Sequence, residues 1–272
     1  MAQRNQPARG LKPSLEPGAT SLYASPAYYD KAYRKRRVDL DFYVRTLQGT
    51  RGGVLELGAG SGRITLALAR AGLAVTAVDS SPTMLDALSE RLKAEPLAVQ
   101  RRVRVVMGDM RALTLDETFR WVIAPFNTVL HLYTPDDIAG FFLTAKRHLR
   151  PRGELLFDYA TPRVRDLAVD PQRWYKGGSL IEPTSGKRVR YAERFHYSPQ
   201  RQVLSTWLHF APIDGSEPWE LLLTHRQFFP QEMRALLTLH GFDKQQWFAD
   251  FGDSAPSALS DVMVVRCQPG RR

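Results

Sequence analysis

Short apolar runs of strand length recur along the first part of the chain, and segments with helical spacing separate them. The runs are 54–57, 73–78, 103–107, 121–124 and 154–158. A continuous apolar run of this length is typical of a strand that is buried on both faces. Strands that alternate with helices in this way predict an α/β fold with a doubly wound parallel sheet, which binds its ligands at the carboxyl ends of the strands.

A different pattern follows in the second half of the chain. Polar and apolar residues alternate at period two over 187–197, 202–210 and 219–226, with turn residues between these runs. This alternation predicts antiparallel strands. We therefore expect an antiparallel β insert over 175–229. It would lie over the substrate end of the site, either as a lid or as extra sheet for stability or dimerisation.

The last part of the chain is expected to complete the main sheet. Pro230 and Gly241 mark the ends of a helix over 230–240. Two further apolar runs, near 245–248 and 261–267, would form an antiparallel hairpin at the edge of the sheet. The completed sheet is then expected to have seven strands, most of them parallel.

The first of these strands leads into a turn that has almost no side chains. Gly58, Gly60 and Gly62 precede a helix, so that bare backbone can approach a ligand. The dinucleotide-binding fingerprint G-x-G-x-x-G does not fit, because Arg63 stands where its third glycine would be. The turn therefore predicts a backbone-lined ligand site other than a dinucleotide site.

Acidic residues follow the second and the third strand. Asp79 ends the second strand, where a carboxylate can accept hydrogen bonds from both ribose hydroxyls of a nucleoside. Asp109 follows the third strand, where it can accept a hydrogen bond from an adenine amino group while Met110 packs on the ring. Between the two strands, Ser81 and Pro82 favour the start of a helix. Both acids are therefore expected at the ligand site.

The glycine turn and its flanks resemble a known motif. Glu56-Leu-Gly-Ala-Gly-Ser-Gly62 resembles the first motif of class I S-adenosylmethionine (SAM)-dependent methyltransferases. The resemblance covers residues 27–160 in detail and the rest of the chain more loosely. The N-terminal segment is similar to that of small bacterial enzymes that methylate small molecules, including the amino-sugar N-methyltransferases. The matching positions are Tyr29, Asp30, Tyr33, Arg36, Asp39, Phe42 and Tyr43.

The resemblance implies a Rossmann-like sheet, SAM as the cofactor and in-line transfer of its methyl group. In similar enzymes the N-terminal segment folds over the cofactor, so Arg36 is expected to pair with the SAM carboxylate while a tyrosine closes over the methyl group. A buried carboxylate is costly unless it is paired, and the SAM amino group would be the partner of Glu56. The expected cofactor-binding residues are Tyr29, Tyr33, Arg36, Glu56, Gly58, Ala59, Gly60, Gly62, Asp79, Ser80, Met84, Asp109, Met110 and Phe126.

The segment after the fourth strand is expected to face the methyl acceptor. In the amino-sugar N-methyltransferases a histidine at the position of His131 lies near the acceptor, which makes His131 the expected base or acceptor-orienting residue. Tyr33 and Asn127 complete the expected catalytic set. A base matters for a hydroxyl acceptor and less for an amine, which need only bind deprotonated. Transfer to N and transfer to O therefore both remain open.

Composition restricts the kind of protein and its expected location. The chain has 272 residues, of which 43% are apolar, as expected for a folded domain. Its one cysteine excludes a disulfide framework and a cysteine-based zinc cluster, and its histidines show no metal-ligand spacing, so no metal is expected. No apolar run has the length of a membrane span, and the N-terminus does not resemble a signal peptide. A cytoplasmic location is expected.

The net charge of +10 raises the question of a nucleic-acid partner. The cations occur in clusters scattered along the chain, and no continuous phosphate track toward the site is evident. A small-molecule acceptor is therefore favoured, for a monomer or a homodimer. Methylation of RNA or protein is one alternative, and a catalytically silent protein that binds SAM or S-adenosylhomocysteine (SAH) is another.

These patterns also predict how the chain is organised. A flexible tail is followed by a helical cap segment, a SAM-binding core, the β insert and the completion of the core sheet. The predicted boundaries are 1–22 for the tail, 23–50 for the cap, 51–174 for the core, 175–229 for the insert and 230–272 for the completion.

Overall fold

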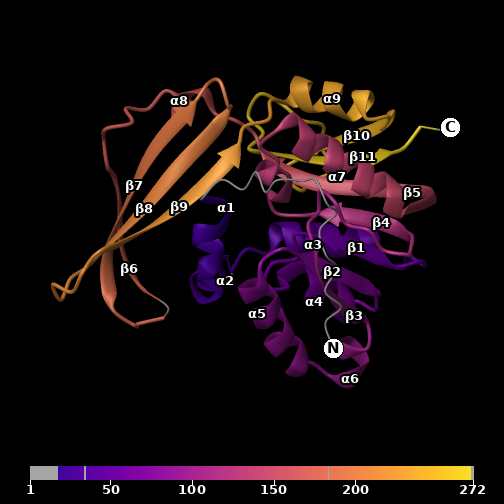
Figure 1. Cartoon of the computed structure of the whole chain (residues 1–272), viewed down its shortest axis with the longest axis horizontal. Coiled ribbons are helices and arrows are strands. Elements are labelled where there is room, and N and C mark those ends of the chain that lie inside the picture. Colours follow the sequence, from indigo (N-terminus) through magenta and orange to yellow (C-terminus); the bar gives the residue numbers. More distant parts are fainter. Residues whose placement is uncertain (1–17, 34, 183, 271–272) are drawn as a thin grey trace.

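The computed structural model describes residues 18–33, 35–182 and 184–270 (Figure 1). Its larger sheet has seven strands in the order β10-β11-β5-β4-β1-β2-β3. These strands are β1 (Val54–Leu57), β2 (Val75–Asp79), β3 (Val103–Met107), β4 (Phe119–Ala124), β5 (Leu149–Ala160), β10 (Lys244–Ala249) and β11 (Val262–Gln268). Strands β1 to β5 pair in parallel, whereas β11 pairs antiparallel with both β5 and β10. The predicted doubly wound sheet and its closing hairpin are confirmed.

Helices cover both faces of this sheet. They are α3 (Val38–Leu47), α4 (Arg63–Arg70), α5 (Pro82–Lys93), α6 (Leu97–Gln100), α7 (Pro135–His148) and α9 (Pro230–Leu239). Apolar residues of α7 and α9 pack on one face, together with β4 and β5 side chains. Those of α3, α4 and α5 pack on the other face. Because both faces are covered, the strands are apolar almost throughout, which is why they were readable in the sequence.

Two helix starts follow directly from local sequence. The Ser81 hydroxyl accepts a hydrogen bond from the Met84 backbone N–H at 3.4 Å, and Pro82 occupies the first turn of α5, as predicted. Thr134 and Asp137 form a reciprocal capping box at the start of α7. Such caps satisfy backbone N–H groups that have no partner inside the helix.

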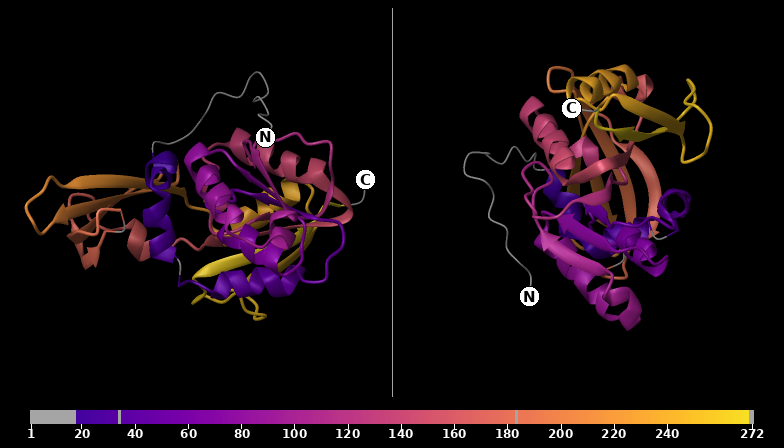
Figure 2. Two further views of the ribbon diagram at one scale, coloured as in Figure 1. Left: turned by 90° about the horizontal axis from the view of Figure 1, so that it is seen from below. Right: turned by 90° about the vertical axis from the view of Figure 1, so that its right-hand side faces the viewer.

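The predicted antiparallel insert is a separate four-stranded sheet in the order β6-β7-β8-β9, and it projects to one side of the main sheet (Figures 1 and 2). It consists of β6 (Tyr175–Ile181), β7 (Arg188–Ser198), β8 (Val203–Pro212) and β9 (Trp219–Arg226). Strands β7, β8 and β9 match the runs of alternating residues. Strand β6 was not singled out, because its glycines interrupt the alternation. The short α8 (Val164–Leu167) precedes the insert.

The N-terminal elements lie between the insert and the main sheet (Figure 1). They are α1 (Gly18–Ser21), the 3₁₀ turn η1 (Leu22–Ala24) and α2 (Pro26–Tyr33). Leu22 is buried in one cluster with Val189, Leu208 and Phe210 of the insert. The Ser21 hydroxyl accepts a hydrogen bond from the Leu222 N–H at 3.1 Å. Among the residues that the structure describes, β9 is an edge strand of its sheet, so Ser21 satisfies one group of an open edge.

The expected tail over residues 1–22 needs a correction at its end. Residues 1–17 lie outside the described part of the chain. Residues 18–22 are helical, and Leu22 is buried, with only 3% of its surface exposed. Their structure depends on contacts with the insert, which lies far along the sequence and cannot be read from the N-terminal composition. Of the helices in the described ranges, none is long and apolar enough to cross a membrane.

Candidate active site

A cavity of about 390 Å³ lies at the carboxyl ends of β1, β2, β3 and β4. This is the edge at which a doubly wound sheet binds its ligand. Most of the residues that the sequence predicted for the site line this cavity. They are Tyr29, Glu56, Gly58, Ala59, Gly60, Asp79, Ser80, Met84, Asp109, Met110, Phe126 and His131. The patterns of distant segments therefore converge on one place, although their individual roles stay predictions.

Gly62 and Asn127 do not line the cavity. Gly62 has a left-handed φ of 85° as the residue before α4, and a Cβ there would lie 2.1 Å from the Leu88 side chain, so glycine is needed for packing. The Asn127 side-chain oxygen accepts a hydrogen bond from the Ala160 N–H at 2.7 Å. Both residues support the wall from behind.

Tyr33 and Arg36 also lie outside the lining, and α2 ends at Tyr33, so one helix does not carry both. They nevertheless gather with Tyr29 around Phe126, which does line the cavity. The Tyr33 ring lies 4.7 Å from the Phe126 ring, and the Arg36 guanidinium lies 5.6 Å from the same ring. The N-terminal segment therefore lies against the cavity wall at Phe126, and Tyr29 of the same segment lines the cavity directly.

The Asp79 carboxylate connects the glycine turn to the start of α5. It accepts hydrogen bonds from the Gly60 N–H at 2.7 Å and from the Ser81 N–H at 2.8 Å. Burial raises the pKa of this carboxyl above its usual value. Each oxygen keeps a lone pair, so the group can still accept hydrogen bonds from a ribose on the cavity side.

Glu56 is 1% exposed and lies at the base of the cavity. The Thr65 hydroxyl donates a hydrogen bond to it at 2.6 Å. Burial raises the pKa of the Glu56 carboxyl to about 8. A cationic group beside it would therefore stabilise the ionised form strongly, which fits the amino group of a bound amino-acid moiety.

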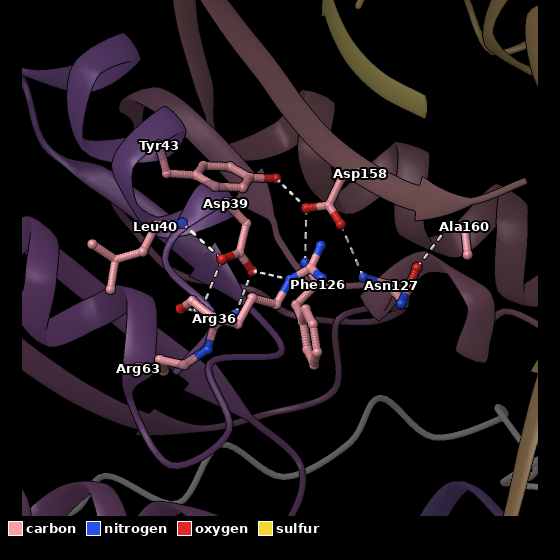
Figure 3. A network of polar contacts seen from close by, with 9 residues as sticks. All are labelled: Arg36, Asp39, Leu40, Tyr43, Arg63, Phe126, Asn127, Asp158 and Ala160. Carbon is pink, nitrogen blue, oxygen red and sulfur yellow. Dashed lines mark hydrogen bonds and ion pairs between the residues drawn. The ribbon is translucent and has the colours of Figure 1, made fainter. Parts of the chain in front are cut away.

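Arg63 is a cavity residue that sequence reasoning missed. It was used only to exclude a dinucleotide fingerprint, yet its side chain lines the cavity while that of Arg36 does not. Asp39, which is fully buried, accepts hydrogen bonds from both terminal nitrogens of Arg63, one of them at 3.0 Å (Figure 3). The Arg63 guanidinium lies 4.8 Å from the centre of the Phe126 ring. Arg63 stands in the first turn of the helix that follows the glycine turn. This position in the sequence could have revealed it as a site residue.

A second buried carboxylate shapes the loop that carries Phe126 (Figure 3). Phe126 and Asn127 have left-handed φ values of 58° and 64°, which non-glycine residues seldom adopt. Asp158 accepts hydrogen bonds from the Phe126 N–H at 2.8 Å and from the Asn127 N–H at 3.3 Å. The Tyr43 hydroxyl donates to the same carboxylate at 2.7 Å. Asp158 therefore holds the loop in a conformation that its own sequence disfavours.

Asp109 lines the cavity, and Arg111 holds its carboxylate in place. The Arg111 guanidinium donates to the Asp109 carboxylate, with Nε 2.9 Å from one oxygen and 3.0 Å from the other. Arg111 also donates to Asp137 at 2.7 Å. This network fixes the direction of Asp109, whose predicted contact with an adenine amino group stays a prediction.

His131 lines the cavity and lies between two tyrosines. Its Nε2 is 2.8 Å from the Tyr23 hydroxyl, and its Nδ1 is 2.9 Å from the Tyr133 hydroxyl. Burial, and then the neighbouring His225, lower the pKa of His131 to about 3. The imidazole is therefore neutral at physiological pH and acts as a hydrogen-bonding group. Tyr23 also lines the cavity, although no sequence motif pointed to it.

The cavity lining combines ionisable and neutral groups. Glu56, Arg63 and Asp79 contribute ionisable side chains to the lining, whereas the His131 imidazole is neutral near pH 7. In the part of the chain that the structure describes, no cluster of three or more His, Cys, Asp or Glu residues could hold a metal ion.

Comparison with known proteins finds similarity to methyltransferases. Residues 54–153 match a family model described as a methyltransferase domain. The cypemycin N-terminal methyltransferase of a Streptomyces species is 37% identical over 155 residues, which cover 57% of this chain and 59% of that protein. The CcbJ methyltransferase of Streptomyces caelestis superposes with a TM-score of 0.74 at 24% identity, over 86% of this chain and 95% of that one. The glycopeptide N-methyltransferase MtfA, solved in complex with SAM, gives a TM-score of 0.59 at 25% identity, over 85% and 86% of the two chains.

Proposed function

We propose that this protein, which belongs to the class I SAM-dependent methyltransferases and uses SAM as its methyl donor, methylates an amine nitrogen of a small molecule. The family and the cofactor are the premise, and the choice of nitrogen is the proposal. The names of two relatives, an N-terminal methyltransferase and a glycopeptide N-methyltransferase, describe N-methylation in those proteins. They support the proposal without fixing the acceptor of this chain.

The single observation that carries the choice of nitrogen is the neutral acceptor end of the cavity. The pKa of His131 is lowered to about 3 by burial and His225, and burial raises the pKa of Tyr23 well above its usual value. A histidine with a lowered pKa is a weak base, its Nε2 already bonds to the Tyr23 hydroxyl, and a protonated tyrosine is no base, so neither group favours removal of a proton from an alcohol near neutral pH. An amine that binds deprotonated needs no such base, because its lone pair is already available. The site therefore suits an amine better than a hydroxyl group.

The opposite end of the cavity fits the amino-acid and ribose parts of SAM. We assign the SAM ammonium to Glu56, its carboxylate to Arg63 and its ribose hydroxyls to Asp79, with backbone of the glycine turn between them. Bound SAM would supply an electrophilic methyl group on a sulfonium sulfur. The nitrogen lone pair of the acceptor would form the new bond to this methyl carbon as the carbon–sulfur bond breaks, and the electron pair of the broken bond would remain on sulfur.

The residues of the chain then act mainly by positioning and by excluding water. Phe126 and Tyr29 form part of the wall, and Tyr33, Arg36 and Asn127 hold that wall from behind. We assign these last three residues positioning roles. The insert over 175–229 lies beside the acceptor end, because Thr224 of β9 bonds to Tyr133, and we propose that it forms part of the acceptor site.

A transfer assay with methyl-labelled SAM tests the proposal. Pools of primary and secondary amines are compared with matched alcohols and phenols, and with bulk tRNA at physiological salt. We expect label to enter amine pools. Label in the alcohols or phenols would refute the choice of nitrogen, and label in tRNA would favour a nucleic-acid substrate. A protein that binds SAH but transfers no label to any pool would be the silent binder.

A further inference from the structure

The 3₁₀ turn η1 brings an aromatic residue from the N-terminal segment into the acceptor end of the cavity. Tyr23 of this turn lines the cavity and meets the His131 ring edge-on, with ring centres 5.4 Å apart. Its ring also packs on Tyr29, at 5.8 Å between centres. The Tyr23 hydroxyl is thus placed between the His131 imidazole and the cavity.

The contacts behind His131 are all satisfied by one arrangement of donors and acceptors. The Tyr133 hydroxyl donates to the Thr224 carbonyl oxygen at 3.0 Å, which leaves the Thr224 hydroxyl, 2.9 Å away, to donate to the Tyr133 oxygen. The Tyr133 oxygen is then left to accept from Nδ1 of His131 at 2.9 Å. Nδ1 therefore carries the proton of the neutral imidazole, and Nε2 carries the lone pair. That lone pair accepts the hydrogen of the Tyr23 hydroxyl at 2.8 Å.

The consequence concerns the Tyr23 oxygen. Its hydrogen is committed to His131, so the oxygen offers only lone pairs to the cavity and acts there as an acceptor. We propose, on the premise of the N-methyltransferase function above, that Tyr23 accepts a hydrogen bond from the N–H of the substrate amine. The bond turns the nitrogen lone pair toward the methyl carbon. His131 is then a positioning residue that acts through Tyr23.

This arrangement selects among amines. A primary or a secondary amine has an N–H to donate, whereas a tertiary amine has none and would leave the Tyr23 oxygen without its partner. The enzyme therefore methylates primary and secondary amines and does not form quaternary ammonium products. A buried polar group that loses its partner costs more than the bond itself contributes, which makes the discrimination strong.

The groups around Tyr23 and His131 keep the tyrosine protonated and the imidazole neutral. Burial raises the pKa of Tyr23, as do the neighbouring Tyr29, Tyr133 and Asp79, so Tyr23 stays protonated. His225, whose own pKa burial lowers to about 4, adds to the lowering at His131. Because His131 does not become a cation near neutral pH, the methylated product keeps its proton and leaves as an ammonium ion.

The direction of the hydrogen bonds between Tyr23, His131 and Tyr133 can be measured without a methyl acceptor. In protein labelled with ¹⁵N at histidine, the His131 resonances, assigned by their loss in His131→Asn, should show a protonated Nδ1 and an unprotonated Nε2. In Tyr23→Phe the Nε2 resonance should shift, since its donor is gone. A protonated Nε2 in the wild-type protein would overturn the proposal, because Tyr23 would then present its hydrogen to the cavity.

The second test uses the acceptor found in the labelled-SAM assay together with its mono- and dimethylated forms. Tyr23→Phe should lower kcat/KM by about tenfold or more, because misplaced nucleophiles react slowly, while SAH affinity stays at the wild-type value. Tyr28→Phe is the matched control, since Tyr28 lies outside the cavity lining and its ring packs on Phe210 at 5.3 Å.

The outcomes separate this proposal from the proposed function. Unchanged or increased activity in Tyr23→Phe would overturn the role of Tyr23, and an increase would make η1 an obstruction. Methylation of the dimethylated form would overturn the predicted selectivity. Failure of the broader function would instead be seen as label in alcohols, phenols or tRNA, or in no pool, irrespective of the His131 tautomer.

Discussion

Binding of SAH should release a proton from Glu56. The pKa of this carboxyl is raised to about 8 by burial, so the group is mostly protonated at pH 7 in the free protein. The fraction protonated follows as about 0.9. A ligand ammonium placed beside Glu56 favours the carboxylate, and ionising it at pH 7 costs about 1.4 kcal/mol for the one pKa unit. As the pH rises toward 8, SAH binding is therefore expected to strengthen by up to about tenfold for each pH unit.

Calorimetric titrations with SAH at pH 7, in buffers of different ionisation enthalpy, measure this release directly. The observed enthalpy should vary with the buffer enthalpy with a slope that corresponds to about 0.9 proton released. In Glu56→Gln the slope should fall close to zero, because the glutamine amide has no proton to lose, and SAH should bind more weakly. A wild-type slope near zero, or an equal slope in Glu56→Gln, would refute the placement of the ammonium beside Glu56.

Two further predictions concern the carboxylates behind the cavity wall. The folded pKa of Asp158 is raised to about 6, above its usual 3.8, so its contribution to stability is present at low pH and is lost as pH rises through that window. The free energy of unfolding of the wild type relative to Asp158→Asn should fall by about 2 kcal/mol between pH 3.8 and 6 in urea titrations, and a pH-independent difference would contradict this. Asp39→Asn should destabilise the fold by about 3 kcal/mol or more, because Arg63 loses its ionic partner in a largely buried position, and it should weaken SAH binding. Wild-type unfolding and affinity in this variant would show that the pair does not support the site.

The main sheet could be predicted because its strands are buried on both faces. A strand such as Val54–Leu57 is apolar throughout and stands out from the amphipathic helices around it. Strand β6 was not predicted, since most of its residues are exposed and two adjacent glycines interrupt its pattern. Arg36 was expected at the SAM carboxylate, but α2 ends at Tyr33 and Arg36 lies outside the cavity lining.

The candidate site was predictable where residues adjoin a strand end. Asp79 and Asp109 directly follow β2 and β3, so the topology alone brings them to one edge. Tyr23 could not be found in this way, because it bonds to a histidine 108 positions away and the intervening fold decides the contact. Arg63 was visible in the sequence, but its direction depends on Asp39 of α3, whose docking no local pattern encodes.

Calorimetric titration of the folded protein with SAH, with Asp79→Ala beside the wild type, tests the central claim most directly. We expect micromolar binding that Asp79→Ala weakens by tenfold or more, which corresponds to about 1.4 kcal/mol. The exposed Asp86 lies on the next helix, and Asp86→Ala should bind as the wild type does. Absence of binding to the folded wild-type protein, or equal affinity in Asp79→Ala, would contradict the assignment of this cavity as the SAM site of a methyltransferase.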